Sequence, residues 1–120
     1  MTTPIATFFE AWKIQGAEAR FNKISAAVTK NVKYNDPRTQ QTLNGILELS
    51  DYVGMFSSNA PGWVAEVKKH DEMGDMTRVT VSFSGPGPDG ANQEQFGQYF
   101  IEREGDLLSR LYGFVGTGEL

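Results

Sequence analysis

The spacing of apolar residues changes near Trp63, and this change constrains the fold more than any other feature of the sequence. Before Trp63, apolar residues recur every three or four positions, whereas beyond it they alternate with polar residues, as in residues 77–84. The first spacing predicts helices, and the second predicts strands with one buried face. Helices followed by strands that are joined by short turns predict an α+β domain with a mainly antiparallel sheet.

Three helices are predicted before that change. Thr3 is a suitable N-cap, and Pro4 fits the first position of a helix. The stop signal Asn59–Gly62 ends the third helix. The predicted helices cover residues 4–16, a shorter segment with Phe21, Ile24 and Val28 on one face, and residues 45–58.

Five strands are predicted around and after the third helix. The first covers residues 29–34 and is followed by a polar loop over residues 36–42. The other four begin at residues 63, 77, 93 and 107, with a polar turn at 71–75 and a tail at 116–120. We expect one sheet to curve around the helices and form a cone with an apolar mouth.

Composition limits the partners that this chain can have. Its 120 residues are the size of one domain, and we expect residues 1–120 to form it. Fifteen acidic and eleven basic residues give a net charge of −4, and the basic residues are scattered, so no nucleic-acid partner is expected. No signal peptide or membrane-spanning run is recognisable, so we expect a cytoplasmic protein with no membrane partner.

Metal and thiol chemistry are not expected. Cysteine is absent, which excludes a disulfide framework and a thiol nucleophile. A metal would need oxygen ligands together with the single His70. That residue precedes a turn beside Asp71 and Glu72, where a solvated hairpin end is the simpler interpretation.

The segment Tyr34-Asn35-Asp36-Pro37 places a carboxylate where the first predicted strand stops. Pro37 favours an extended backbone at Asp36. A carboxylate at the rim of a curved sheet, next to an apolar pocket, suits a general base. The same residues also occur in ordinary turns, in which the aspartate accepts hydrogen bonds from nearby backbone N–H groups. Tyr34 shares the strand parity of Asp36, so its hydroxyl could reach the same pocket or lie in the core.

With these features the chain resembles the SnoaL-like and ketosteroid isomerase-like superfamily, also called nuclear-transport-factor-two-like. The resemblance covers nearly the whole chain and implies a cone-shaped, cystatin-like fold, a hydrophobic pocket and a homodimer formed through the sheet. Its members include isomerases, dehydratases, polyketide cyclases and binding modules, so the fold alone does not fix the function. Besides the order of elements, the resemblance depends on four short segments: Asp36-Pro37, Asn44-Gly45, Thr80–Phe83 and Gln98–Phe100.

The resemblance implies that Asp36 is the general base that moves a proton between carbons. The isomerases stabilise the resulting oxyanion with a tyrosine on the first helix and a protonated acid on the third long strand. Phe9 and Gln98 stand at these positions here. Phe9 cannot donate a hydrogen bond, and a glutamine amide is a weaker donor than a neutral acid, which argues against steroid isomerisation itself.

Strand parity gives the remaining candidate ligand contacts. The resemblance implies that Gln98 faces the cone interior, and Arg110 and Tyr112 would then face it too. An inward Arg110 would either weaken Asp36 as a base or anchor an anionic substrate; a structural ion pair is the alternative. The apolar residues expected on the outer face, which a second copy would cover, are Tyr99, Ile101 and Leu111.

Two functions are therefore carried forward. The first is a cofactor-independent isomerase, dehydratase or polyketide cyclase-like enzyme that acts on a small hydrophobic or carbonyl-containing molecule. Asp36 would be its base, while Tyr34, Gln98, Arg110 and Tyr112 orient the substrate and Phe9 and Trp12 form an apolar wall. The second is a non-catalytic small-molecule-binding or dimerisation module of the same fold. Core packing is the alternative role for Phe9 and Trp12.

Overall fold

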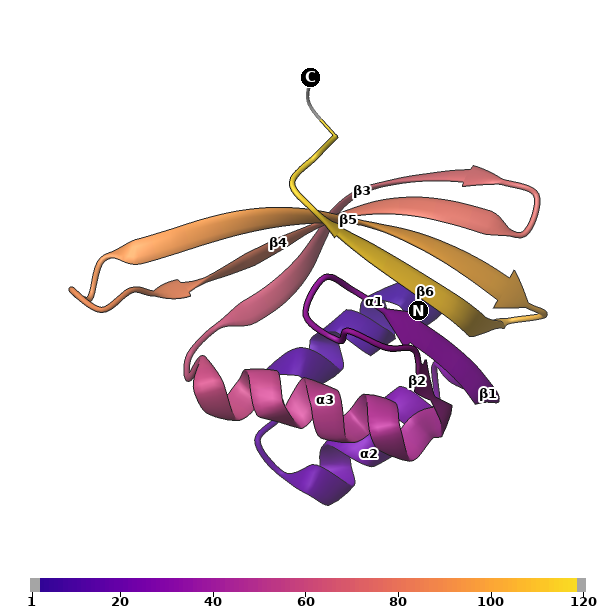
Figure 1. Ribbon diagram of the computed structural model, residues 1–120, viewed down its shortest axis with the longest axis horizontal. Helices are drawn as coiled ribbons and strands as arrows, with labels where there is room; N and C mark the ends of the chain where they lie inside the picture. The colour runs from indigo at the N-terminus through magenta and orange to yellow at the C-terminus, as the bar shows by residue number, and fades with distance from the viewer. Residues whose placement is uncertain (1–2, 119–120) are drawn as a thin grey trace.

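The computed structural model describes residues 3–118, in which three α-helices cover one face of a curved six-stranded sheet (Figure 1). This arrangement is the predicted α+β cone. No helix among the described residues is both long and apolar enough to cross a membrane. The elements in chain order are α1 (Pro4–Glu10), the 3-10 turn η1 (Ala11–Lys13), α2 (Ala17–Ser25), β1 (Val28–Asn35), β2 (Leu43–Asn44), α3 (Gly45–Asn59), β3 (Val64–Met73), β4 (Met76–Pro86), β5 (Asn92–Glu104) and β6 (Leu107–Val115).

The ends of the helices follow local chemistry. Thr3 caps α1, since its Oγ1 accepts a hydrogen bond of 3.2 Å from the backbone N–H of Ala6, and Pro4 occupies the first turn. The first helical segment is less regular than predicted, because α1 ends at Glu10 and continues only as η1. Val28 was expected on the face of the second helix, but it is a buried residue at the start of β1.

The sheet has the order β2-β1-β6-β5-β4-β3. Every neighbouring pair is antiparallel except β1 and β6, which are parallel. The mainly antiparallel prediction is therefore confirmed, and the parallel pair brings an early strand beside the last one. The β3–β4 hairpin is longer than predicted, because its turn is only Gly74-Asp75, where Gly74 has a φ of 59°.

The core lies between the helices and the concave face of the sheet. Its largest fully buried side chains include Phe8 and Phe9 from α1, Leu49 from α3, and Ile101 and Leu111 from the sheet. The strands curve over the helices, and the last described residues, 116–118, lie on the opposite side of the sheet (Figure 1). One face of β5 and β6 therefore packs on the helices, while the other faces outward.

The predicted orientation of β5 and β6 is wrong. Tyr99, Ile101 and Leu111 were expected to face outward, but their side chains are 3%, 0% and 0% exposed and belong to the core. Successive residues of a strand point to opposite faces, so the alternate set faces outward instead. That set includes Gln98, Arg110 and Tyr112, which were expected to face the cone interior.

Glycines explain why this face is the inner one. Gly97 of β5 and Gly113 of β6 are both buried and share the parity of Tyr99. A β-carbon on Gly113 would lie 2.7 Å from Cε2 of Tyr99 and 3.2 Å from Cβ of Asp36. Only a residue without a side chain lets these two groups approach the strand, as is typical of a glycine inside a strand.

Candidate functional site

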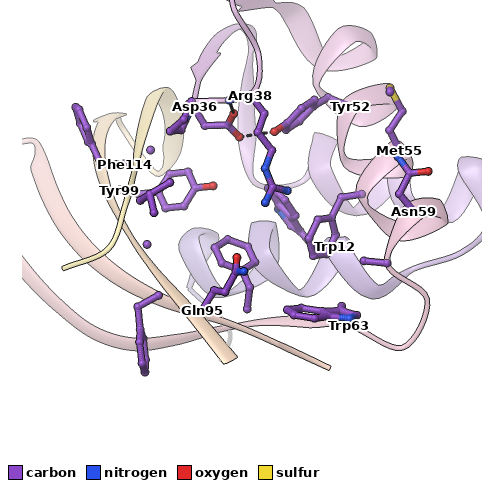
Figure 2. Close-up of a pocket in the computed structure, with 18 of the residues that line it drawn as sticks. Trp12, Asp36, Arg38, Tyr52, Met55, Asn59, Trp63, Gln95, Tyr99 and Phe114 are labelled. Carbon is purple, nitrogen blue, oxygen red and sulfur yellow. Dashed lines mark hydrogen bonds between the residues drawn. The ribbon is translucent and has the colours of Figure 1, made fainter. Parts of the chain in front are cut away.

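A pocket of about 500 Å³ opens between α3 and the concave face of the sheet, at the end where the loop after β1 passes (Figure 2). Its wall is mainly aromatic and aliphatic, with polar groups from that loop and from β5. This combination is typical of sites for small molecules. Residues that line it include Trp12, Asp36, Arg38, Tyr52, Phe56, Trp63, Phe83, Gln95 and Tyr99.

Asp36 lies on the pocket wall immediately after β1. Its position is set by the parallel pairing in which Asn35, the last residue of β1, lies opposite Tyr112 of β6. The side chain is half-buried, and it accepts hydrogen bonds at both carboxylate oxygens. Oδ1 accepts from the backbone N–H of Arg38 at 2.8 Å, which is the turn interaction expected of an aspartate in this sequence. Asp36 therefore both forms the turn and lies on the pocket wall.

Two tyrosine hydroxyls converge on the other oxygen of Asp36. Oδ2 accepts a hydrogen bond of 2.7 Å from Tyr34 of β1. It accepts another of 2.5 Å from Tyr52 of α3 (Figure 2). The hydroxyl of Tyr34 also lies 2.7 Å from that of Tyr99. Because Tyr34 has one hydroxyl hydrogen and donates it to Asp36, Tyr99 donates to Tyr34. The result is a chain of donors that ends on a single carboxylate.

The surroundings keep these hydroxyls protonated. Burial raises the pKa of Tyr34 well above its ordinary value, and the neighbouring Tyr99 and Asp36 raise it further. Burial also raises the pKa of Tyr52, together with its hydrogen bond to Asp36. The pKa of Tyr99 is raised by burial, although its bond to Tyr34 lowers it in part. All three side chains are therefore neutral hydrogen-bond donors at physiological pH.

The apolar part of the pocket is a cluster of aromatic rings. Trp12 packs edge-on against Phe56, with ring centroids 5.0 Å apart, and lies 5.5 Å from Phe83. Trp63 closes the far end, and its indole N–H donates to the carbonyl of Pro86 at 3.0 Å. The indole N–H of Trp12 is buried and has no hydrogen-bond partner in residues 3–118. A ligand that enters the pocket would thus meet mainly the aromatic rings.

Only some of the residues predicted for the site lie in the pocket. Asp36 and Trp12 line it, and Tyr34 lies behind Asp36, fully buried. Phe9 is a core residue, 1% exposed, whose ring packs edge-on against Tyr99 at 5.0 Å. Gln98, Arg110 and Tyr112 lie on the other face of the sheet and are absent from the pocket wall.

Tyr52, Tyr99 and Arg38 are among the pocket residues that sequence reasoning missed. Tyr52 lies three positions after Leu49 and four before Phe56 in α3, so helical spacing could have placed it beside them. Tyr99 was assigned to the wrong face, although mid-strand Gly97 and Gly113 are signals of close approach to the inner face. Arg38 follows the Asp36-Pro37 motif directly, but no periodic pattern in the loop indicates its direction.

The fold and the site define a class, namely a cone-shaped α+β domain with an aromatic pocket and a carboxylate at its wall. Comparison with solved structures identifies this as the fold shared by SnoaL-like, ketosteroid isomerase-like and nuclear-transport-factor-two-like proteins. The predicted fold is confirmed. No protein-family model and no curated protein matches the sequence.

Three of the similar structures illustrate the range. A protein proposed to be an isomerase of the SnoaL-like family, from Agrobacterium tumefaciens str. C58, has a TM-score of 0.79 and 20% identity over 95% of each chain. A hypothetical protein with a ketosteroid isomerase-like fold from Catenulispora acidiphila, in complex with trimethylamine, has a TM-score of 0.78 and 13% identity over 96% of this chain and 88% of its own. A proposed SnoaL-like polyketide cyclase from Jannaschia sp. CCS1 has a TM-score of 0.73 and 14% identity, covering 92% and 80%.

Proposed function

We propose that this protein is a cofactor-independent enzyme that moves a proton in a small, largely apolar carbonyl compound, as an isomerase, dehydratase or polyketide cyclase does. The observation that carries the proposal is the position of Asp36. Its carboxylate lies on the wall of an aromatic pocket, and the hydroxyls of Tyr52 and Tyr99, which line the same pocket, belong to its hydrogen-bond chain. Similar structures described as a proposed isomerase and a proposed polyketide cyclase support it.

In this mechanism Asp36 takes the proton from the carbon next to the substrate carbonyl. The carbon–hydrogen bond breaks, the proton moves to the carboxylate, and the electron pair moves to the carbonyl oxygen as an enolate. Asp36 then returns the proton to another carbon in an isomerisation, or to a departing hydroxyl in a dehydration. In a cyclisation, the enolate carbon attacks a second carbonyl instead, and the oxygen of that carbonyl takes the proton back from Asp36.

The tyrosines would respond to that transfer. Asp36 accepts from both Tyr34 and Tyr52 while it is ionised, and it loses acceptor capacity once it is protonated. The hydroxyl of Tyr52 is then free to donate to the enolate oxygen. A donor that is released as the negative charge develops stabilises the transition state more than the ground state. Among the described residues that line the pocket, Asp36 is the carboxylate, which makes it the candidate for the base.

A second function is favoured by one specific observation. Both oxygens of Asp36 already have donors before any ligand is present. A carboxylate in that state can serve simply to hold the tyrosines and the loop in place. The protein would then be a non-catalytic module that binds a small hydrophobic molecule. The cytoplasmic location and the homodimer remain predictions under either function.

Hydrogen–deuterium exchange of a model ketone separates the two functions without knowledge of the natural substrate. We would incubate 2-tetralone, whose protons next to the carbonyl are acidic, with the protein in D₂O and follow the loss of proton signals by NMR. The enzyme function requires faster exchange with the native protein than with Asp36→Asn. Loss of a general base lowers such rates by about 10²- to 10⁴-fold. Circular dichroism would check that both proteins are folded. Equal exchange rates with the native protein and Asp36→Asn would then rule out the enzyme and favour the binding module.

A further inference from the structure

Arg38 places a cation at the pocket that no described residue pairs with. It follows the turn that Asp36 begins, and its side chain is exposed and lines the pocket. Figure 2 shows this side chain extending from the Asp36 end of the pocket toward Trp12. Within residues 3–118 the guanidinium makes no ion pair and no hydrogen bond. Five N–H donors are therefore available for an acceptor that the described part of the chain does not supply.

Asp36 does not fill that role, although it is the nearest acid in sequence. Its carboxylate forms no ion pair with the guanidinium, and its oxygens accept from Tyr34, Tyr52 and the backbone N–H of Arg38 instead. The negative charge at the Asp36 end is thus surrounded by donors. The positive charge of Arg38, in contrast, has no counterpart among residues 3–118.

A second group in the pocket also lacks an acceptor. Trp12 is 2% exposed, lines the pocket, and has an indole N–H with no hydrogen-bond partner in the described chain. A buried donor without an acceptor destabilises a protein unless water or a ligand satisfies it. Beside the guanidinium of Arg38, the pocket wall therefore contains a buried donor that no described residue satisfies.

We propose that the natural ligand carries a carboxylate, which binds the guanidinium of Arg38 while the apolar body of the ligand lies against Trp12 and Phe83. This inference depends on the proposed function only in requiring that the pocket is a binding site for small molecules. Arg fits the role because its planar guanidinium forms two parallel hydrogen bonds with a carboxylate. The carbonyl to be enolised would lie at the other end, near Tyr52 and Asp36.

The test compares three probes that differ only in their head group. They are 4-phenylbutanoate, its neutral amide 4-phenylbutanamide and the cationic 4-phenylbutylamine. Both tryptophans of the chain, Trp12 and Trp63, line the pocket, so tryptophan fluorescence reports binding directly. We expect the carboxylate to bind about tenfold more tightly than the amide, the range of one charge-assisted hydrogen-bonded pair.

Two variants identify the group responsible. Arg38→Gln removes the guanidinium but keeps the backbone N–H that Asp36 accepts, so it should bind the carboxylate and the amide equally. Arg78→Gln is the matched control, because it changes the net charge by the same amount. Arg78 lies on the β3–β4 hairpin and pairs with Asp71 at 2.9 Å, outside the pocket wall. This variant should keep the tenfold preference.

Each other outcome overturns the inference in a distinguishable way. Equal affinity of the native protein for carboxylate and amide would remove the anion site and leave the pocket and its proton-transfer function intact. Tightest binding of the amine would show that Asp36 selects a cation. If Arg38→Gln still bound the carboxylate more tightly than the amide, a group other than Arg38 would be responsible for the preference. No binding of any probe at millimolar concentration would count against the pocket itself, and with it against the proposed function.

Discussion

The hydroxyl of Tyr52 donates a hydrogen bond of 2.5 Å to Oδ2 of Asp36, which joins the middle of α3 to the loop that follows β1. Helix and loop are thereby fixed relative to each other at the pocket. The position of the carboxylate is set by three elements, because Tyr34 reaches it from β1 and Gly113 of β6 lies against its Cβ. A site held in this way keeps its geometry when no ligand is present.

Tyr52→Phe should separate catalysis from binding. The ring remains, so its edge-on contact with Trp12 at 6.3 Å is kept, while the donor for the developing enolate is lost. We expect the exchange rate of 2-tetralone to fall by about 100-fold or more, with little change in the affinity for the amide probe. If Tyr52→Phe exchanged 2-tetralone protons as fast as the native protein, Tyr99 would be the donor that stabilises the enolate.

Tyr34→Phe should lower the stability of the fold. This change removes one donor from Asp36 and leaves the buried hydroxyl of Tyr99 without its acceptor. We expect a loss of about 1–3 kcal/mol in the free energy of unfolding, measured by urea denaturation. Tyr112→Phe on the outer face is the matched control and should change it little. An equal loss in both variants would show that the hydrogen-bond chain adds nothing specific.

The tyrosine chain should also produce alkaline sensitivity. Burial raises the pKa values of Tyr34 and Tyr99 in the folded state above those of the unfolded chain. Below pH of about 10 both states keep these protons, and the stability is complete. Above it the unfolded chain releases protons that the native state retains, so stability falls by about 1.4 kcal/mol per pH unit for each group. Urea midpoints at rising pH should decrease, and less steeply in Tyr34→Phe.

Gly113→Ala should disturb the site more than a typical glycine substitution. The new β-carbon would lie 2.7 Å from the ring of Tyr99 and 3.2 Å from Cβ of Asp36, so both must move. We expect destabilisation of about 1–3 kcal/mol and weaker binding of the phenyl probes. Gly16→Ala is the control, because its β-carbon would meet nothing within 4 Å. Unchanged binding in Gly113→Ala would show that the pocket tolerates movement of Tyr99.

The apolar residues that could form the interface of the predicted homodimer differ from those that strand parity suggested. The outer face of the sheet carries Phe96 and Phe114, which are 41% and 57% exposed, and Phe100, whose ring contacts Phe114 at 5.7 Å. Exposed aromatic clusters of this kind are typical of interfaces. Light scattering should give twice the mass of one chain, and Phe100→Glu should give a monomer. Met73→Glu, at the exposed hairpin end, should remain dimeric.

The sequence predicted the order of helices and strands because local signals agree with the tertiary structure. Thr3 and Pro4 fix the start of α1, and Asn59–Gly62 follows the body of α3. The position of Asp36 after β1 was likewise predictable, since a proline and a change from strand to turn mark it. Its role as a base stays a prediction.

The inner face of β5 and β6 could not be predicted in the same way. Both parities of β5 carry large apolar residues, with Phe96 and Phe100 on one face and Tyr99 and Ile101 on the other. Alternation shows that a strand has two faces but not which one the helices cover. The glycines at 97 and 113 contain that information, and using it requires knowing that Tyr99 and Asp36 need the space.

The parallel pairing of β1 with β6 has a consequence for the order in which the molecule is built. Asp36 follows β1, whereas Gly113 beside it belongs to β6, so the pocket closes only after the residues up to Gly113 have been synthesised. Contacts between residues so far apart in sequence form slowly and late during folding. The β3–β4 and β4–β5 hairpins can form locally beforehand. Binding activity should therefore appear in the last phase of refolding and report the native state alone.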